Sequence, residues 1–400
     1  MSSRCPGVRR WGVNGSFSPT TLPSLEPSAE PFVQRSHTLD AIRGIAILQV
    51  LVWHYLVPSL NHHGTFLSLL LSASLNLTWT GVDLFFVLSG FLIGGILMDN
   101  REATNMFSVF YARRILRILP LYALTIALFQ LFGPPASLWP YLTFTQNMVW
   151  AADGHWGPTW TGVTWSLAVE EQFYLVLPLI VWCIRPTLLP IVVVALCCIA
   201  PVARWVCAEW LYQSHYASYL LMPCRMDALF GGVLVAWFVR RHRSAGSGRR
   251  RETLLYGAIA VLGSGFVIML CTGQQDLSTF MITIGYTWIA AFYASILLLA
   301  ALRPHAFGSG VIHHPFRLLG LGAYAIYLFH QPLLSVLTKF GHQWSFSLLL
   351  ATCATMATAW LSWRYIEKPC ITFGQKRFRY RVGVAVIAIS QPRVGASVTG

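Results

Sequence analysis

The hydrophobic positions of this chain fall into long runs separated by short polar connections. A helix needs about 20 apolar residues to cross a membrane. Ten windows of about that length lie at residues 41–60, 79–98, 118–133, 166–184, 188–207, 222–239, 254–272, 280–302, 318–338 and 346–364. The pattern therefore predicts an all-α fold, a polytopic transmembrane bundle of about ten spans.

The short apolar run from Phe66 to Leu75 decides the orientation of every later span. Its ten residues would extend about 15 Å as a helix, so we interpret it as a re-entrant or interfacial piece. Nineteen Lys and Arg residues then fall in the even-numbered connections and after the last span, against three in the odd-numbered connections. Because cytoplasmic loops are enriched in Lys and Arg, both termini are expected in the cytoplasm.

Composition agrees with a membrane protein and sets the two ends of the chain apart. Apolar residues make up 56% of the chain and charged residues 10%, against roughly 45–50% and 25% in soluble domains. Residues 1–37 contain five prolines and no apolar run, which predicts a disordered tail before a transmembrane domain at 38–370. Residues 371–400 are interpreted as a basic cytoplasmic tail.

A net charge of +14 could indicate nucleic-acid binding, and nine cysteines could indicate disulfides or a metal site. The positions of these residues along the chain argue against both. The basic residues lie between apolar runs rather than on one face, which argues for membrane topology and against nucleic-acid binding. The cysteines form no CxxC pair, so we interpret them as packing residues rather than as disulfide or metal ligands. No bound metal or permanent cofactor is expected.

Two ionisable residues share the first apolar helix, Leu39 to Tyr55. Arg43 and His54 are eleven residues apart, which returns a helix to within about 20° of its starting direction. Both side chains should lie on one stripe, separated by a rise on the order of 16 Å. With the N-terminus in the cytoplasm, Arg43 is expected near the inner surface of the membrane and His54 in its outer third.

Further ionisable residues interrupt the other apolar windows. Such side chains cost about 2.5 to 3.5 kcal/mol at mid-bilayer and usually face an interior cavity. The orientation predicts that side chains from four helices converge near the depth of His54, and that His330 lies close by. These converging residues are Asp83, Glu170, Glu171, Arg225 and Asp227.

The predicted convergence suggests acid–base chemistry. A histidine can take a proton from a hydroxyl group near neutral pH, and a carboxylate of Asp83, Glu170 or Glu171 could fix its tautomer. At the inner surface, Arg43 and the cluster Arg113, Arg114 and Arg117 could bind phosphates, because guanidinium forks match phosphate oxygens. Positive-inside anchoring explains that cluster equally well.

Seven segments resemble the acyltransferase type 3 family of integral membrane O-acyltransferases. The resemblance covers about residues 38–370. The matching segments are Arg43 followed by His54, GVDLFFVLSGFLI at 81–93, RRILRILP at 113–120, WSLAVEEQFYLVLP at 165–178, RMDALFGG at 225–232, YAIYLFHQPL at 324–333 and YIEKP at 365–369. The resemblance implies that Arg43 and His54 are essential and that acyl-CoA is the donor.

This family acylates surface polysaccharides, lipopolysaccharide O-antigen and some macrolides. We therefore expect a multi-pass acyltransferase of the bacterial inner membrane that moves an acyl group, expected to be acetyl, to a carbohydrate or lipid-linked hydroxyl. Membrane lipid is a further expected partner. Some relatives carry an additional extracytoplasmic domain, and about thirty residues follow the last span here. The chain is thus expected to pass the acyl group to the acceptor itself or to a separate extracytoplasmic partner.

The residues expected to contact the acceptor line the same depth. His54 would act as general base or carry the acyl group transiently, and Arg225 or a backbone amide would stabilise the oxyanion. The alternatives are a flippase for a lipid-linked sugar and an enzyme that acylates a small metabolite. The expected acceptor-binding residues are Trp165, Ser166, Tyr174, Arg225, Asp227, Tyr327 and His330.

Overall fold

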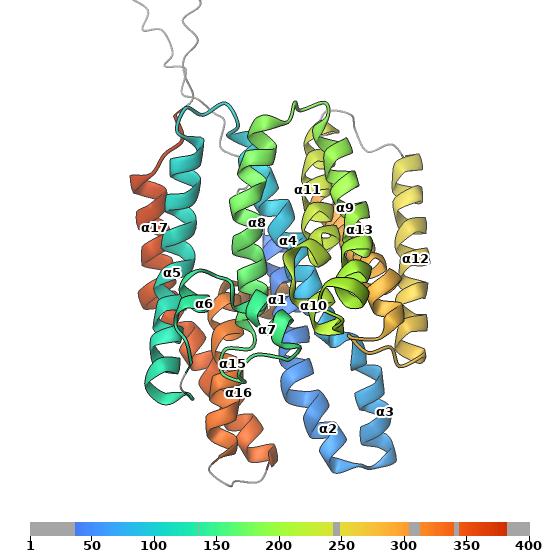
Figure 1. The fold of residues 1–400 in the computed structure, drawn as a ribbon, viewed down its shortest axis with the longest axis vertical. Helices are drawn as coiled ribbons and strands as arrows, with labels where there is room; N and C mark the ends of the chain where they lie inside the picture. The colour runs from blue at the N-terminus through green and yellow to red at the C-terminus, as the bar shows by residue number, and fades with distance from the viewer. Residues whose placement is uncertain (1–36, 135, 243–248, 304–312, 340–343, 382–400) are drawn as a thin grey trace, which may run out of the picture.

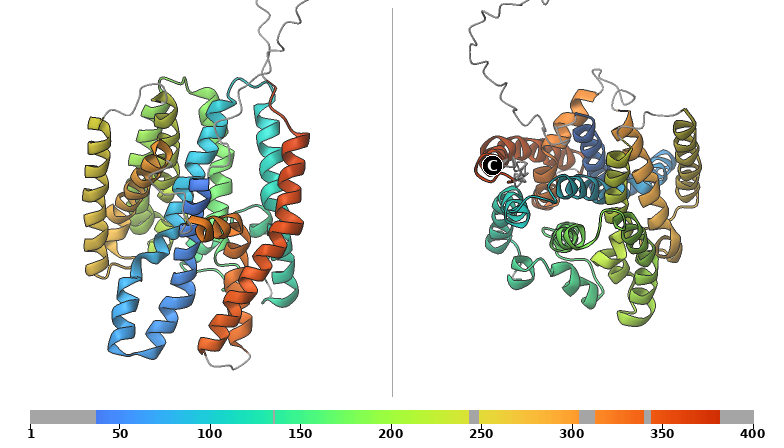
Figure 2. Two further views of the ribbon diagram at one scale, coloured as in Figure 1. Left: turned by 180° about the vertical axis from the view of Figure 1, so that it is seen from behind. Right: turned by 90° about the horizontal axis from the view of Figure 1, so that it is seen from above.

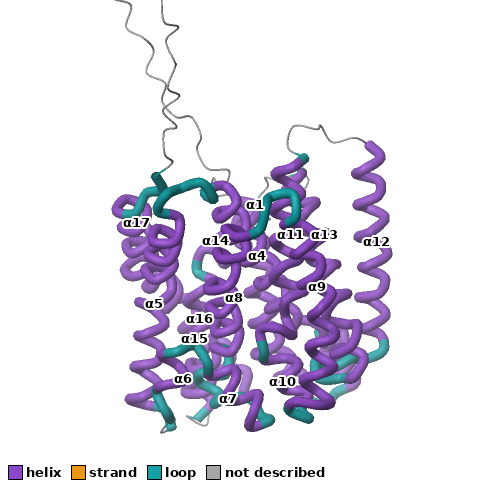
Figure 3. Tube along the Cα trace, turned by 45° about the horizontal axis from the view of Figure 1, so that its top comes forward, coloured by secondary structure: helices purple, strands orange, loops and turns teal. Residues whose placement is uncertain are grey.

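The computed structural model describes residues 37–134, 136–242, 249–303, 313–339 and 344–381. Every regular element in these ranges is a helix, and Figure 3 shows helices joined by short loops. The predicted tails lie outside the described residues, except for His37 and residues 371–381.

The long helices run side by side and form one bundle (Figures 1 and 2). They are α1 (His37–Leu51), α4 (Gly81–Asp99), α5 (Met106–Phe132), α8 (Thr164–Cys183), α9 (Leu189–Val206), α11 (Met226–Arg241), α12 (Arg249–Cys271), α13 (Tyr286–Leu302), α15 (Ala323–Thr338) and α16 (Trp344–Ser362). Shorter α-helices are α2 (Val57–His63), α3 (Phe66–Ser74), α6 (Trp139–Leu142), α7 (Gln146–Asp153), α10 (His215–Leu220), α14 (His313–Leu321) and α17 (Lys368–Arg377). The remaining turns are η1 (Val52–Leu56), η2 (Asn76–Thr80), η3 (Cys207–Leu211), η4 (Met222–Arg225), η5 (Met281–Gly285) and η7 (Trp363–Glu367).

The described residues contain nine helices that are long and apolar enough to cross a membrane. The pair α14 and α15, bent by 74°, makes a tenth if it counts as one span. Each of the ten predicted windows overlaps one of these segments, so the prediction of an all-α bundle with about ten spans is confirmed.

The run from Phe66 to Leu75 belongs to the second span. One helix of 34 residues runs from Phe66 to Asp99 through the 3₁₀ turn η2. It is therefore not a separate span, as predicted, and it continues into the second span rather than forming a separate piece. No glycine or proline separates Phe66 from Gly81, and neither of these strong helix breakers is there to end the helix.

Close contacts between helices depend on glycine. A Cβ atom on Gly90 of α4 would lie 1.8 Å from the Leu229 carbonyl oxygen of α11, and one on Gly232 of α11 would lie 2.0 Å from the Val87 oxygen. Small residues let membrane helices approach closely without a hydrophobic driving force. Of this tight α4–α11 pair, only Val82 of α4 lines the candidate site.

Candidate active site

A cavity of about 280 Å³ lies between the C-terminal end of α1 with η1, the start of α8 and several connections. Most of its wall is apolar or aromatic, and a few polar side chains face it, as is typical of ligand sites. The lining residues are Val50, Trp53, His54, Trp79, Val82, Trp156, Gly157, Thr159, Gly162, Val163, Trp165, Tyr219, Asp276, Tyr327 and Gln331.

His54 lies in a π-helical turn that interrupts the first transmembrane helix. In an α-helix the carbonyl group of His54 would accept a hydrogen bond from residue 58, but Pro58 has no N–H and its ring crowds that carbonyl. The chain widens instead, and the Val57 N–H donates to the Val52 carbonyl oxygen. Such π-bulges are frequent at functional sites. The straight-helix stripe predicted for Arg43 and His54 therefore ends at this turn.

The neighbour of His54 is His330 of α15. Nδ1 of His54 lies 3.0 Å from the Val50 carbonyl oxygen and 3.2 Å from Nε2 of His330. Nδ1 of His330 lies 2.8 Å from the Tyr327 carbonyl oxygen. Carbonyl oxygens only accept, so both Nδ1 atoms carry a proton and Nε2 of His330 is an acceptor. This assignment leaves a lone pair on Nε2 of His54, which makes no hydrogen bond to the described residues.

Tyr55 fixes the two histidines relative to each other. Its hydroxyl donates to the His330 carbonyl oxygen at 2.7 Å and lies 3.0 Å from Oγ1 of Thr355 on α16. Tyr55, His330 and Thr355 are all buried. The residue after His54 thus joins the π-turn to α15 and α16, and this contact holds the imidazole rings 4.9 Å apart.

No carboxylate among the described residues forms a hydrogen bond or an ion pair with His54, contrary to the prediction. Asp83 instead forms an ion pair with Arg225, and both side chains are 1% exposed. The Arg225 guanidinium also lies over the rings of Tyr286 and Tyr219, at 4.2 and 4.9 Å from their centroids. Arg225 does not line the cavity, so the geometry does not support the predicted oxyanion role.

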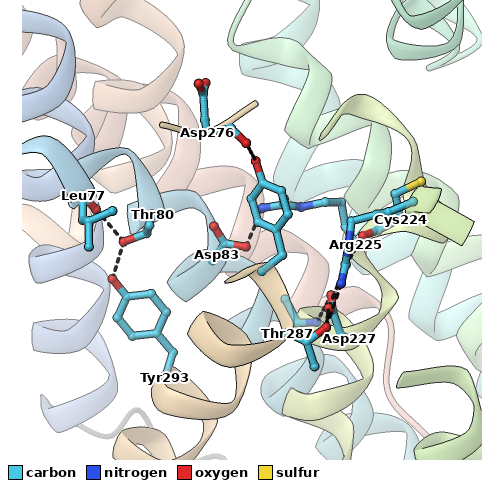
Figure 4. Close-up of polar contacts among 12 residues, drawn as sticks. Leu77, Thr80, Asp83, Cys224, Arg225, Asp227, Asp276, Thr287 and Tyr293 are labelled. Atoms are coloured by element: carbon cyan, nitrogen blue, oxygen red, sulfur yellow. Dashed lines mark hydrogen bonds and ion pairs between the residues drawn. The ribbon is translucent and has the colours of Figure 1, made fainter. Parts of the chain in front are cut away.

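Asp227 forms a second buried pair, with Arg204 of α9. Arg204 donates to Asp227 Oδ2 at 2.8 Å, and the Thr287 hydroxyl donates to the same oxygen at 2.7 Å. Arg204 also donates to the carbonyl oxygens of Cys224 and Ile282. Figure 4 shows this group and the Asp83–Arg225 pair side by side. Both pairs join helices, and the expected contact of Asp227 with an acceptor is not supported.

Glu170 and Glu171 lie farther along α8 than the cavity. Trp165 lines the cavity, and five or six further residues along an α-helix rise about 8 Å. Glu170 accepts a hydrogen bond from Tyr174 at 2.9 Å, and Glu171 interacts electrostatically with Arg114. Both carboxylates lie away from the cavity, near Arg114 and Arg117, rather than beside His54 as predicted. Tyr174 lies with them rather than in the cavity wall.

Three arginines lie near these two glutamates. We call them the arginine cluster: Arg43, Arg114 and Arg117. The charge of Arg43 interacts with those of Arg114 and Arg117. Arg43 contacts Asp40 at 3.1 Å, whereas Arg114 and Arg117 form no ion pair with the described residues. Arg114 and Arg117 lie on α5, which begins at Met106, rather than in the connection before it.

Arg113 faces a different partner. It donates to the Phe378 carbonyl oxygen at 2.9 and 2.6 Å and lies over the Tyr380 ring. Burial raises the pKa of Tyr380, and the nearby Arg113 and Arg114 oppose that shift. The contacts of Arg113 to the end of the described chain separate it from the arginine cluster.

Of the remaining predicted residues, three meet at the cavity. Trp165 and Tyr327 line it, and the buried Ser166 hydroxyl lies 2.5 Å from the Tyr327 hydroxyl. The structure adds lining residues that the sequence analysis did not single out: Trp53, Trp79, Tyr219, Asp276 and Gln331. Trp156 also lines the cavity, and its connection contains Trp139, Trp150 and Trp160 as well. This concentration of aromatic residues is a signal in the sequence for part of the wall.

Asp276 is the carboxylate of the cavity wall. It lies in the connection between α12 and η5, and its Oδ1 accepts a hydrogen bond from the Leu277 N–H at 3.0 Å. Burial raises the pKa of Asp276, and the Leu277 N–H opposes the shift. No group of three His, Cys, Asp or Glu residues in the described ranges is arranged to hold a metal ion.

The chain is similar in sequence to several known proteins. YrhL of Bacillus subtilis (strain 168) is 28% identical over 380 residues, which cover 86% of this chain and 56% of the relative. The peptidoglycan O-acetyltransferase OatA of Listeria monocytogenes is 24% identical over 366 residues, covering 83% of this chain and 55% of the relative. The O-acetyltransferase OatA of Staphylococcus aureus (strain NCTC 8325 / PS 47) is 24% identical over 374 residues, with 86% and 58% covered.

The chain thus spans little more than half the length of these relatives. No solved structure matches it. The family model described as "Acyltransferase domain" (Acyl_transf_3) matches residues 36–366, which include the cavity, both histidines and the arginine cluster. The chain belongs to this family of membrane acyltransferases.

Proposed function

We propose that this chain transfers an acetyl group from acetyl-CoA to a hydroxyl group of a cell-wall carbohydrate. The observation that carries the proposal is the unpartnered Nε2 of His54 in an aromatic-lined cavity. An oriented imidazole with a free lone pair is suited to general-base catalysis. The names of two relatives support acetyl as the acyl group, and the Listeria relative is named for peptidoglycan.

The arginine cluster would bind the phosphates of the donor. Arg114 and Arg117 have no anionic partner in contact, and guanidinium groups bind phosphate oxygens through paired hydrogen bonds. The rise from Arg43 to His54, on the order of 16 Å, suits the pantetheine arm of CoA. In the bacterial inner membrane the cluster would face the cytoplasm and the cavity the outside, in agreement with the distribution of basic residues.

The reaction then follows from the geometry of His54. Its Nε2 takes the proton of the acceptor hydroxyl while that oxygen attacks the thioester carbonyl carbon. A C–O bond forms, the C–S bond breaks, and the departing thiolate takes the proton from the imidazolium. Gln331 lines the cavity next to His330 and makes no hydrogen bond to the described residues, so its amide N–H is the proposed oxyanion donor.

Purified protein in detergent tests this function. Labelled acetyl-CoA and soluble peptidoglycan fragments should yield free CoA and a labelled sugar ester, and His54→Ala should abolish ester formation. His242→Ala is the matched control, because His242 follows α11 and does not line the cavity. Full transfer by the His54→Ala variant would contradict the mechanism. Transport of a lipid-linked sugar without release of CoA would instead support the flippase alternative.

A further inference from the structure

The connection between α12 and α13 holds Asp276 in a fixed position at the cavity. Three hydrogen bonds from other elements reach backbone carbonyl groups of this connection. Asn76 donates to Gln274 at 3.0 Å, His215 lies 2.8 Å from the Leu277 oxygen, and the Tyr286 hydroxyl donates to Asp276. A binding group supported in this way is pre-organised before its ligand arrives.

The Asp276 carboxylate forms no ion pair among the described residues, although the charge of Arg225 acts on it from beyond contact distance. Figure 4 shows that it points away from Arg225, which is paired with Asp83. Oδ1 accepts the Leu277 N–H, and the backbone N–H of Asp276 also acts on the carboxylate. A carboxylate has about four acceptor positions, so this half-buried group at the cavity can still accept hydrogen bonds from ligand hydroxyl groups.

An aromatic wall borders this carboxylate. Tyr219 packs against Trp156, Trp165 and Trp79, with ring centroids 5.0, 4.7 and 6.2 Å apart. Trp156 keeps 38% of its surface exposed, so part of its indole is available to a ligand. An indole face and an adjacent hydroxyl acceptor match the two kinds of surface on a sugar ring, its apolar C–H face and its hydroxyl edge.

Charge separates this part of the cavity from the donor site. Asp276 would repel the phosphates of CoA, whereas the arginine cluster would attract them. A neutral ligand rich in hydroxyl groups meets no such repulsion at Asp276. We propose that Asp276 and Trp156 form the acceptor subsite and that Asp276 binds hydroxyl groups of a carbohydrate. This inference rests on the proposed acetyl transfer and names the site of its acceptor.

The variant Asp276→Asn tests the subsite with little structural change. Asparagine keeps the Oδ1 acceptor for the Leu277 N–H but removes the charge that strengthens hydrogen bonds to hydroxyl groups. Asp153→Asn is the matched control, because Asp153 ends α7, has a side chain 55% exposed and does not line the cavity. The probe is a preparation of peptidoglycan disaccharides released by a muramidase.

We expect Asp276→Asn to raise the KM for these disaccharides roughly tenfold. Asp153→Asn should match the wild type both in this KM and in the release of CoA without acceptor. An acceptor KM within twofold of wild type in Asp276→Asn would overturn the subsite and leave the proposed function intact.

A second measurement keeps the two proposals apart. If the wild type consumes no acetyl-CoA, the proposed function fails, and binding of the same disaccharides is then followed through tryptophan fluorescence. Binding by the wild type that weakens about tenfold in Asp276→Asn would support the subsite alone. Equal binding by both proteins, or none by either, would overturn the subsite as well.

Discussion

The cavity around His54 and the arginine cluster both include residues of α1, but their polar groups are arranged differently. At the cavity, each histidine Nδ1 has a carbonyl partner, and only Nε2 of His54 remains open. At the cluster, three like charges interact with one another, and two of them have no ion-pair partner in the described ranges. The cavity is ordered by its own hydrogen bonds, whereas two arginines of the cluster are left without a direct ion pair.

This difference indicates which region carries chemistry and which carries binding. A reacting group needs a defined tautomer and direction, which neutral hydrogen bonds supply. An anion site needs charge that the fold has not already neutralised. The nearby Glu170 and Glu171 moderate the charge of the cluster without a direct ion pair to any of its arginines. Substitutions in the two regions should therefore affect different kinetic constants.

The largest effect in this comparison is expected from Gln331→Leu. The change keeps a side chain of similar size but removes the amide donor from the cavity wall. Loss of one oxyanion donor lowers kcat by about 100- to 1,000-fold in other enzymes. We expect a fall of that order here with a nearly unchanged KM for acetyl-CoA.

Gln331→Glu is a second test of the same donor. It keeps the shape of the side chain but places an acceptor where a donor is required, so its kcat should fall as much as that of Gln331→Leu. Activity of either variant within threefold of wild type would show that another group stabilises the oxyanion.

A smaller effect is expected from the double change Arg114→Ala and Arg117→Ala. Removal of two guanidinium groups from the donor site should raise the KM for acetyl-CoA by about 10- to 100-fold, because each charge-assisted contact contributes roughly 1.5 to 3 kcal/mol before solvent exposure reduces it. The value of kcat at saturation should change little. Steady-state kinetics at low and high salt measure this effect.

Arg113→Ala is the internal control for the cluster. Its guanidinium is bound to the Phe378 carbonyl oxygen, so its loss should leave the KM for acetyl-CoA near the wild-type value. If Arg113→Ala raised this KM as much as the double variant, the boundary of the donor site would have to include the end of α17.

Hydropathy predicted the bundle because the membrane imposes helix length directly. The ten windows agree with the structure, but their edges do not reveal helices that continue through polar residues. The 118–133 window omitted roughly the first three turns of α5, so Arg114 and Arg117 appeared to lie in a connection. The same limitation hid the continuity of α3 with α4.

The position of each residue along the bundle and its contacts in the site could not be predicted from the sequence, because both depend on how the helices pack. The order of residues in WSLAVEEQFY places Trp165 and Glu170 on one helix, but only packing shows that Trp165 reaches the cavity and Glu170 the cluster. Pro58 did signal the widened turn at His54, since its position four residues later removes one hydrogen bond. Asp276 had no local signal, because its connection joins the site through contacts to distant helices.

The smallest effect on activity is expected from His330→Leu. This variant tests whether His330 orients His54. Leucine removes the acceptor at Nε2 of His330, but the Val50 carbonyl oxygen still accepts from Nδ1 of His54 at 3.0 Å. The reactive tautomer therefore persists, and we expect only about a tenfold loss of kcat with both KM values unchanged. His330→Gln can place an amide oxygen near the lost acceptor and should restore most of the activity. A loss as large as that of His54→Ala in both variants would show that His330 itself exchanges the proton, whereas equal, mild losses in both would limit His330 to packing.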